Sequence, residues 1–561
     1  MKRSLVVFVM LALVAALFST AMAAPRRGGT VVIGLFGDNE TLNPILSESN
    51  SEREVLQAVF SSLYRTDQDT DFVPDLLTKM PTKKGLTYYY ELRKGVKFSD
   101  GHELDSQDVK FTWECHMNPK IPVPTRSGFD EIKSFDIPTI TYKGKDGKTY
   151  KTYDKYHFSI TLKKVYARYD LLWADKAIVP KHILEKEIAE NKAKNAPNHM
   201  EKGGKFSRNP IGSGPFILKE WVADNYIMVA RNPNYFRAGQ PYLDKIIWKI
   251  IPDSNAMLNQ LKTGEIDVYR GIQANRYNEA VRIPGIKVFK IPAYIYNHIE
   301  LNMNDPNDLS KPHPILADKR VRQALDYAYP REMIVETVLE NVGYPAYSNL
   351  PPISWAYNKN VAKPHYDPEK AKKLLDEAGW VMGNDGYRYK NGRKLQLTFH
   401  TNAGNKTREQ VGVICQEEWK KIGVDLVPKF IDFATLTGDI MDNRKFDCLM
   451  IAWISDADPD SKSLWHSSQI PSKENQEGQN YVGYRNPEMD KLMEDGLATD
   501  NIEARKKIYH RMQEILAEDV PYIFVNFYVD VDGIKEGLEN FRSNPTTATF
   551  MWNCYEWYWS R

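Results

Sequence analysis

Segments with the period of an amphipathic helix alternate with short apolar runs through the second half of the chain. In YDPEKAKKLLDEAGW, Asp367 is a natural N-cap and Pro368 suits the first helical position. The stretches DKRVRQALDYAY and TREQVGVICQEEWKKIG repeat an apolar stripe at helical spacing. Strand patterns occupy residues 394–400, 424–430 and 446–453. This alternation predicts an α/β fold in which helices cover the faces of a sheet.

The length of the chain predicts more than one lobe. It has 561 residues, well past the ~250–300 at which a single hydrophobic core stops growing. Residues 117–156 differ from the rest because they are rich in Pro, Gly and Lys, and KDGK within them is typical of a hairpin turn. We expect this stretch to belong to a peripheral subdomain.

The N-terminus has the form of a secretory signal peptide. Residues 1–3 carry two basic side chains, residues 5–18 form an apolar run, and Ala21-Met22-Ala23 fits a cleavage site. We therefore expect residues 1–23 to be removed on export. No other run reaches the roughly 20 apolar residues that span a bilayer, and no cysteine stands at the cleavage site. These features favour a freely diffusing periplasmic protein over a lipoprotein.

The charge balance argues against a strongly charged partner. Lysine and arginine number 75 against 73 aspartates and glutamates, with no long run of one sign. Nucleic acid and an anionic membrane surface are therefore not expected as partners, and a small neutral or zwitterionic ligand fits better. Aromatic residues make up 12% of the chain. They suit the walls of a ligand cavity, although packing in cores and interfaces explains most aromatic residues in proteins.

The cysteines are not expected to determine the fold. Four are too few for a disulfide-built scaffold in a chain of this length. Cys415 lies in a helical pattern and Cys448 in a strand pattern, so the two would pair if that helix packs on that strand. Sequence alone does not fix the connectivity.

Local motifs for catalysis or for cofactors are missing from the sequence. Neither H-E-x-x-H nor G-x-S-x-G occurs, and there is no P-loop or dinucleotide fingerprint. Glu114, Cys115 and His116 are adjacent, but neighbours on a helix point in different directions, so a structural role is favoured over a metal site. We expect no enzyme activity, cofactor or metal centre. A secreted hydrolase is the weaker alternative, because paired carboxylates can come from distant positions.

Residues 452–469, AWISDADPDSKSLWHSSQ, place three aspartates at alternate positions between two tryptophans. An EF-hand is excluded, because counting from Asp456 its sixth and twelfth positions hold Ser461 and Ser467. The stretch begins where a predicted buried strand ends, and ligands of open α/β sheets bind beyond the carboxyl ends of strands. Two interpretations stay open, a polar turn stabilised by aspartate and a buried carboxylate that holds a cation.

Residues 88–114, YYYELRKGVKFSDGHELDSQDVKFTWE, resemble the signature of the family 5 extracellular solute-binding proteins, the receptors of peptide-type ABC importers. That signature is an aromatic strand, L-R-x-G-V-x-F, a D-G turn, and a helix with D-V-x-F-x-W/F-E, which we expect Ser106 to cap. Further segments that are similar to the family, in the same order, lie at 212–236, 259–268, 318–334, 366–380 and 480–493. The resemblance implies a two-lobed periplasmic-binding-protein fold with an extra subdomain, which closes on its ligand like a hinged trap.

The resemblance also implies a division of the chain. Residues 294–303 and 521–531 both have the pattern of extended apolar crossings, which suits a two-stranded hinge. We therefore expect lobe I at residues 24–293, with the peripheral subdomain at about 72–200. Lobe II is expected at 294–525, and residues 526–561 return to lobe I.

The same resemblance assigns candidate ligand-binding residues. In peptide-binding members a W-x-x-D pattern pairs its aspartate with the α-ammonium of the peptide, and here it falls on Trp453 and Asp456, with Ala452 and Ile454 beside them. The spacer before Asp458-Pro459 is shorter than is common in the family, so Asp458 is an alternative anchor. Either aspartate has the plainer alternative of stabilising the turn.

A second wall of the site is implied at the loop of Glu48, Ser49 and Asn50, which would present backbone groups to an extended peptide. Trp465 and His466 follow the aspartates and line either a pocket or the core.

The function implied is a periplasmic receptor that captures a small solute by lobe closure and delivers it to the permease of an ABC transporter. An oligopeptide is the expected ligand, and an oligosaccharide or a metal chelate is the alternative, because a fold does not fix its ligand. We expect a monomer that binds no nucleic acid.

Overall fold

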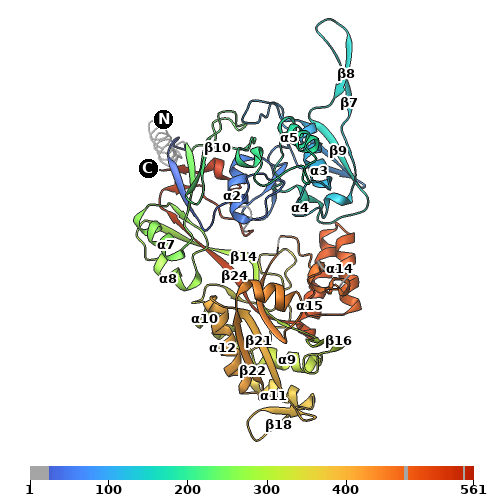
Figure 1. Ribbon diagram of the computed structural model, residues 1–561, viewed down its shortest axis with the longest axis vertical. Coiled ribbons are helices and arrows are strands. Elements are labelled where there is room, and N and C mark those ends of the chain that lie inside the picture. The colour runs from blue at the N-terminus through green and yellow to red at the C-terminus, as the bar shows by residue number, and fades with distance from the viewer. Residues whose placement is uncertain (1–24, 456, 473–474, 476–477, 547–549, 561) are drawn as a thin grey trace, which may run out of the picture.

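The computed structural model describes residues 25–455, 457–472, 475, 478–546 and 550–560. The predicted signal peptide and Asp456 therefore lie outside the described residues. Two lobes share one eleven-stranded mixed sheet with the order β10-β11-β12-β1-β13-β24-β14-β23-β21-β22, and β17 pairs with β24 beside this path. Figure 1 shows the lobes one above the other, with helices packed against both ends of the sheet. No helix in the described part of the chain is both long enough and apolar enough to cross a membrane.

Lobe I contains the first half of this sheet. β1 pairs in parallel with β12, and β11 pairs with β12 in the opposite direction. The helix α7 covers this half, with Asp253 as N-cap and Gly264 ending it in the left-handed conformation. The strands are β10 (Phe216–Val222), β11 (Tyr226–Arg231), β12 (Lys245–Ile250), β1 (Thr30–Leu35) and β13 (Val268–Tyr269), and the helices are α2 (Asn50–Val59), α7 (Ser254–Thr263) and α8 (Tyr277–Ala280).

The peripheral subdomain has its own sheet and core. Its four strands run in the order β4-β5-β9-β6, over a core of aromatic and aliphatic side chains. The predicted hairpin at KDGK is confirmed, because β7 and β8 pair around it. The elements are β4 (Thr82–Lys84), β5 (Thr87–Glu91), α3 (Ser106–Met117), β6 (Ile132–Asp136), β7 (Thr139–Lys143), β8 (Thr149–Tyr153), β9 (His157–Leu162), α4 (Tyr169–Trp173) and α5 (Lys181–Ala193).

One helix cap differs from the prediction. The N-cap of α3 is Asp105, and Ser106 is its first residue. Asp105 accepts from the backbone N–H of Gln107, while Asp108 accepts from the N–H of Asp105. A carboxylate at each position completes a reciprocal capping box, which explains why the helix begins one residue earlier than expected.

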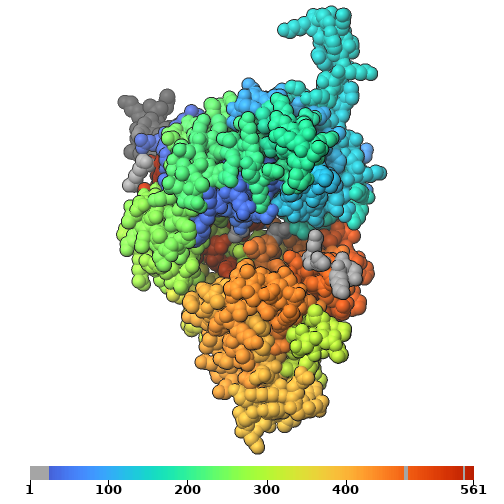
Figure 2. Space-filling model, viewed as in Figure 1, coloured from blue at the N-terminus to red at the C-terminus, as the bar shows by residue number. Residues whose placement is uncertain are grey.

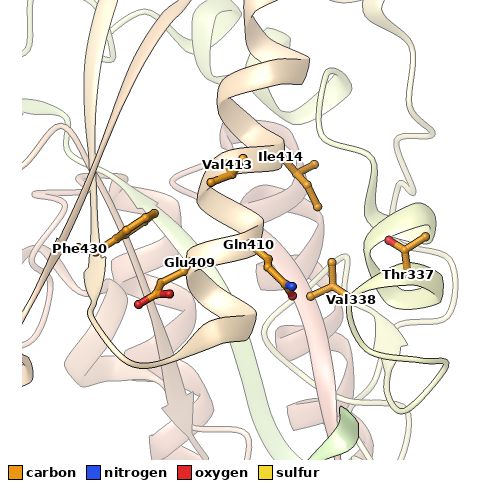
Figure 3. Close-up of a pocket in the computed structure, with 7 residues that line it drawn as sticks. All are labelled: Thr337, Val338, Glu409, Gln410, Val413, Ile414 and Phe430. Carbon is orange, nitrogen blue, oxygen red and sulfur yellow. The ribbon is translucent and has the colours of Figure 1, made fainter.

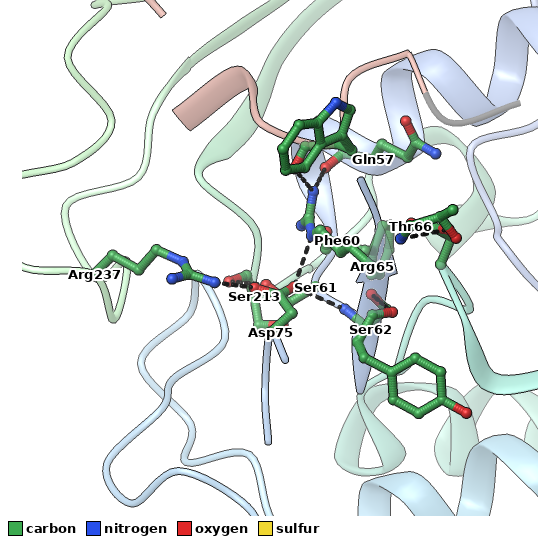
Figure 4. Close-up of polar contacts among 12 residues, drawn as sticks. Gln57, Phe60, Ser61, Ser62, Arg65, Thr66, Asp75, Ser213 and Arg237 are labelled. Atoms are coloured by element: carbon green, nitrogen blue, oxygen red, sulfur yellow. Dashed lines mark hydrogen bonds and ion pairs between the residues drawn. The ribbon is translucent and has the colours of Figure 1, made fainter. Parts of the chain in front are cut away.

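Buried ion pairs fasten the subdomain, lobe I and the C-terminal segment together (Figure 4). The carboxylate of Asp75 is buried and accepts from Arg65 Nε at 2.8 Å and from Arg237 Nη2 at 3.0 Å. Arg65 also donates to the carbonyl oxygens of Phe60 and Trp552, at 3.0 and 3.1 Å. Trp552 belongs to the last part of the chain, so this segment packs on lobe I.

Two long strands, β14 (Ile286–Leu301) and β24 (Tyr522–Lys535), join the lobes. Each runs from one lobe into the other, and they pair with each other on both sides of the junction. Their register shifts between Pro292 and Tyr296, where three residues of β14 lie opposite one of β24, and again between Asn297 and His298. The predicted two-stranded connection is present, and β14 begins earlier than the sequence pattern indicated.

Lobe II contains the second half of the sheet. β21 pairs in parallel with β22 and β23, and β14 pairs antiparallel with β23. Helix α11 has Asp367 as N-cap and Pro368 at its start, as expected. The strands are β21 (Gln396–Asn402), β22 (Asp425–Ile431), β23 (Cys448–Ile454) and β17 (Tyr344–Pro345), and the helices are α9 (Lys319–Tyr327), α10 (Arg331–Thr337), α11 (Pro368–Glu377), α12 (Lys406–Lys420), α13 (Lys462–Trp465), α14 (Pro487–Ala498) and α15 (Ile502–Asp519).

The cysteines are buried free thiols. Cys415 on α12 and Cys448 on β23 belong to the same core cluster, so the helix does pack on the strand. The structure contains no disulfide between them, which decides the question that the sequence left open. Burial raises the pKa of both thiols well above the ordinary range, which keeps them protonated and inert.

Candidate ligand-binding cleft

A cavity of about 590 Å³ lies where the two lobes face each other. Figure 2 shows the hollow between the lobes from outside. The start of α2 and the segment before α4 form its lobe I side, and the end of β23 with the loop after it forms the lobe II side. Its lining residues are Glu48, Asn50, Arg53, Arg168, Tyr296, Asn349, Leu350, Trp453, Ile454, Ser455, Pro459, Asp460, Ser461, Ser463, Leu464 and Gln479.

The lobe I wall is the first turn of α2, built around one buried carboxylate. Glu52 accepts the backbone N–H groups of Glu48 and Ser49 on one oxygen, and those of Glu40 and Thr41 on the other. Ser49 is the N-cap and completes a capping box with Glu52. Burial opposes ionisation of Glu52, but the backbone N–H donors outweigh it and lower its pKa.

This capping box changes what the loop can offer a ligand. The N–H of Ser49 is used by Glu52, and its carbonyl oxygen accepts from the N–H of Arg53 at 3.2 Å. The backbone N–H groups of Ser49 and Glu48 are therefore already engaged within the loop. What the wall presents to the cavity includes the side chains of Glu48, Asn50 and Arg53.

The lobe II wall begins with the last residues of β23. Trp453 pairs with Tyr296 of β14, and both line the cavity. The indole lies parallel to the ring of Tyr481, with centroids 6.4 Å apart. Ile454 is 66% exposed and faces the cavity, whereas Ala452 pairs with Asn297 and is not among the lining residues.

The aspartates after β23 have different partners. Asp458 is buried and bound by both terminal nitrogens of Arg505 on α15, at 2.8 and 2.9 Å. Asp460 lines the cavity and accepts from Arg168 of the subdomain at 3.1 Å, so this pair crosses between the lobes. Asp456 is outside the described residues. The guanidinium of Arg505 already neutralises Asp458, which fits a structural role in the turn better than the anchoring of a ligand ammonium.

Two predicted residues lie behind the cavity wall. Trp465 is fully buried, with its ring centroid 4.3 Å from that of Tyr522. His466 is also buried, and its Nδ1 accepts from the N–H of Ser468 at 3.1 Å. The alternative that places Trp465 in the core is therefore the correct one, because the indole belongs to a buried core cluster of lobe II and is not among the lining residues.

Other lining residues were not singled out by the sequence. Arg168 and Asn349 lie in loops far from residues 453–464 in the chain, without a motif that marks them. Arg53 lies in the first turn of α2, just after the Ser49 cap. The start of this helix was therefore the sequence feature that could have indicated Arg53 as a lining residue.

A second hollow of about 490 Å³ lies on lobe II alone, between α10 and α12 (Figure 3). Its walls are Thr337, Val338, Glu409, Gln410, Val413, Ile414 and Phe430. Only lobe II contributes to this hollow, so a ligand bound there would not draw the two lobes together. Within the described part of the chain, no group of three or more histidine, cysteine or acidic side chains is placed to hold a metal ion.

Comparison with known proteins decides the family. The profile of bacterial extracellular solute-binding proteins, family 5 Middle, matches residues 71–474. The chain belongs to this family. The oligopeptide-binding protein AppA of Bacillus subtilis is 33% identical over 547 residues, which cover 95% of this chain and 92% of AppA. The family 5 assignment confirms the resemblance seen at residues 88–114 and agrees with the two-lobed fold.

Solved structures of the family superpose over nearly the whole chain. AppA in complex with a nonapeptide has a TM-score of 0.72 at 32% identity and covers 96% of this chain and 100% of that one. NikZ of Campylobacter jejuni, in complex with Ni(L-His), has a TM-score of 0.75 at 28% identity, with 94% and 99% covered. The ABC transporter substrate binding protein CtaP of Listeria monocytogenes has a TM-score of 0.79 at 26% identity, with 96% and 100% covered. This family 5 protein is therefore a solute-binding protein, and its relatives differ in what they bind.

Proposed function

We propose that this family 5 protein captures an oligopeptide between its lobes and delivers it to the membrane permease of an ABC transporter. The observation that carries the proposal is the cavity bounded by both lobes. Its volume lies within the ~300–1,000 Å³ of small-ligand sites. A ligand that fills it contacts both lobes at once, and so favours the closed form over the open one.

The proposed anchor for the peptide α-ammonium is Asp456. It follows Ser455, which lines the cavity, and the W-x-x-D pattern places it three residues after Trp453. The two aspartates that follow it are engaged by Arg505 and Arg168. A desolvated ammonium requires a carboxylate partner, because an unpaired charge does not leave water at acceptable cost.

A metal chelate is the second candidate. The structural likeness to NikZ, solved with Ni(L-His), favours it. A chelate carries ligands of its own, so it does not require a preformed cluster of metal-binding side chains. An oligosaccharide is the weaker alternative, in which the aromatic rings of the cleft would stack on sugars.

We also propose the division of the chain into residues 24–293, 294–525 and 526–561, with export to the periplasm after removal of residues 1–23 and a monomer as the working form. The register break between Pro292 and Tyr296 supports the first boundary, because that is where the pairing of the two connecting strands is interrupted. Limited proteolysis that gave two continuous halves, cut once in the middle of the chain, would count against this division.

The test of the peptide function is a double-mutant cycle measured by calorimetry. A free peptide and its N-acetylated form are titrated into wild type and into Asp456→Asn, which removes the charge and keeps the shape. Loss of one member of a buried charge pair costs ~2–5 kcal/mol, so affinity of the wild type should fall roughly 30- to several-thousand-fold on acetylation. The Asp456→Asn protein should lose much less.

Controls separate the candidates. Asp460→Asn has the same charge change at a lining residue, and Ni(L-His) is titrated in parallel. Equal binding of free and acetylated peptides by the wild type contradicts the proposed anchor. Tight binding of Ni(L-His) with no peptide binding replaces the peptide with the chelate. If Asp458→Asn alone abolishes the effect of acetylation, the anchor is Asp458.

Lobe closure has a test of its own. A ligand that binds only the closed form adds ~2.7 kcal/mol to the unfolding free energy at a hundredfold excess over Kd. Small-angle scattering should show a smaller radius of gyration at saturation. An unchanged radius at saturating ligand contradicts the hinged-trap mechanism.

A further inference from the structure

The strands β7 and β8 form a ribbon that projects from the subdomain (Figure 1), and Figure 2 shows that it stands clear of the rest of the surface. All ten of its strand residues are exposed. Its base is fastened by Tyr153, whose hydroxyl donates to Asp105 at 2.7 Å. A two-stranded ribbon alone is only marginally stable in water. A binding partner that covers its exposed side chains would stabilise it.

The strand register sorts the ribbon into two faces. Tyr142 lies opposite Tyr150, and Ile140 lies opposite Thr152. Because side chains alternate along a strand, these four share one face. Tyr142, Tyr150 and Ile140 are 51, 41 and 40% exposed, so this apolar face is open to solvent. Lys151 lies on the opposite face.

The tip of the ribbon is preorganised. The hydroxyl of Tyr150 donates to Asp146 at 2.6 Å, and its ring stacks with that of Tyr142, with centroids 5.6 Å apart and ring planes inclined by 28°. Gly144 approaches so closely that a Cβ there would lie 2.6 Å from the Tyr150 ring. The N–H of Gly144 donates to the carbonyl of Lys148 at 2.9 Å, which closes the turn. The aromatic pair is therefore held in place while it is exposed.

The ribbon is also positively charged, with Lys143 and Lys151 on the face opposite the apolar one and Lys145 and Lys148 in the turn. Residues 143–151 contain four lysines, Lys143, Lys145, Lys148 and Lys151, against one aspartate, which gives a net charge of 4 − 1 = +3. The whole chain carries only +2. Among the described residues, none of these lysines has an ion-pair partner, so their charge is uncompensated.

The charge balance of the whole chain argued against an anionic membrane surface, but the positive charge of the ribbon is concentrated in a few residues. We propose that the ribbon of residues 139–153 docks the protein on an anionic bilayer surface. Tyrosine rings favour the membrane–water interface, where one end of the side chain is apolar and the other is hydrated. The flexible lysine stems reach around a ribbon only two strands wide and place their ammonium groups among anionic headgroups. This proposal does not depend on which ligand occupies the cleft.

The ribbon of a second copy of this chain is a less favoured partner than the bilayer. Lysines on edge strands oppose the addition of a further strand, because like charges would then be brought together. Pairing would also leave the tyrosine face uncovered, since edge-to-edge contact adds strands in the plane of the ribbon.

The test is co-sedimentation of the full chain with phosphatidylcholine vesicles that contain or lack phosphatidylglycerol. The wild type should bind only the anionic vesicles, and raising the salt from about 0.05 M to about 0.5 M should release it. Replacement of Lys143, Lys145, Lys148 and Lys151 by glutamine should lower the partition coefficient at least about tenfold. The matched control replaces Lys186, Lys192, Lys194 and Lys205, four exposed lysines outside the ribbon, and should bind like the wild type.

A second variant tests the apolar face. Ile140→Thr with Tyr142→Ser should weaken vesicle binding severalfold without altering the net charge, which a purely ionic attraction to a soluble polyanion would not do. Circular dichroism checks that each variant is folded. Absence of wild-type binding to anionic vesicles overturns the proposal, as does equal loss in the ribbon and control variants. Dimers in native mass spectrometry that disappear in the ribbon variant, without vesicle binding, assign the ribbon to self-association instead.

Discussion

The two walls of the cavity are held in place by contacts of very different range along the chain. On the lobe I side, Glu52 gathers backbone donors that lie 3 to 12 residues before it. On the lobe II side, Asp458 is bound by Arg505, 47 residues away, and Asp460 by Arg168, 292 residues away. The first wall therefore forms whenever its own segment folds. The second depends on the packing of lobe II and, at Asp460, on the approach of the other lobe.

The largest effect is expected from the buried pair within lobe II. Asp458→Asn leaves the Arg505 guanidinium buried without its counterion, which should lower the unfolding free energy by ~3–5 kcal/mol. Urea denaturation measures the change in the unfolding free energy. Asp495→Asn is the matched control, since its pair with Lys491 is exposed, and it should change stability by less than ~0.5 kcal/mol. A loss at Asp458 no larger than at Asp495 would show that this wall is not fixed by the pair.

An intermediate effect is expected at the capping carboxylate of lobe I. Glu52→Gln replaces charged hydrogen bonds to backbone N–H groups with weaker ones and should cost ~2 kcal/mol at neutral pH. The pKa of Glu52 is lower in the folded protein than the ordinary value of 4.5. Its contribution is therefore fully present above about pH 4.5 and is lost as the pH falls through the folded-state pKa.

Denaturation at several pH values measures how the contribution of Glu52 to the unfolding free energy depends on pH. The difference between wild type and Glu52→Gln should shrink below pH 4.5. Glu48→Gln has the same charge change on a side chain that is 59% exposed, and it should leave both stability and pH dependence nearly unchanged. A difference that stays constant with pH would contradict the role of the ionised carboxylate.

The smallest effect is expected where the walls meet. Arg168→Gln and Asp460→Asn, alone and combined, should weaken ligand binding only severalfold, with a coupling energy of ~0.5–1 kcal/mol, because the pair is partly exposed. The hydrogen bond from Ala167 to Leu497 and the ion pair of Lys83 with Asp500 also join the lobes and would persist. Calorimetry of the four proteins gives the coupling. Fully additive single effects would show that the pair does not contribute to closure.

The same difference in range explains how much of the molecule the sequence predicted. Asp367 and Pro368 were predicted correctly, and the three strands of lobe II to within two residues, because helix caps and apolar periods are local properties. The cap of α3 was misplaced by one residue, because Asp105 and Ser106 are both good caps and only the reciprocal bond to Asp108 decides between them.

At the site, sequence patterns identified several positions but not the partners of their side chains. Glu48, Asn50, Trp453 and Ile454 do line the cavity, whereas Trp465 is core. Trp465 is the last residue of the short helix α13, and its indole packs against Tyr522 of β24. No pattern near Trp465 contains that information.

The sequence by itself determined the alternation of helices and strands, the capped start of α11 and the family 5 signature, because each depends on residues close together in the chain. Tertiary structure alone decided that Arg505 pairs with Asp458, that Arg168 pairs with Asp460 across the cleft, and that Cys415 and Cys448 are free thiols. The physical reason is that a charge or a thiol finds its partner by position in space, which is fixed only when both lobes have packed around the two strands that join them.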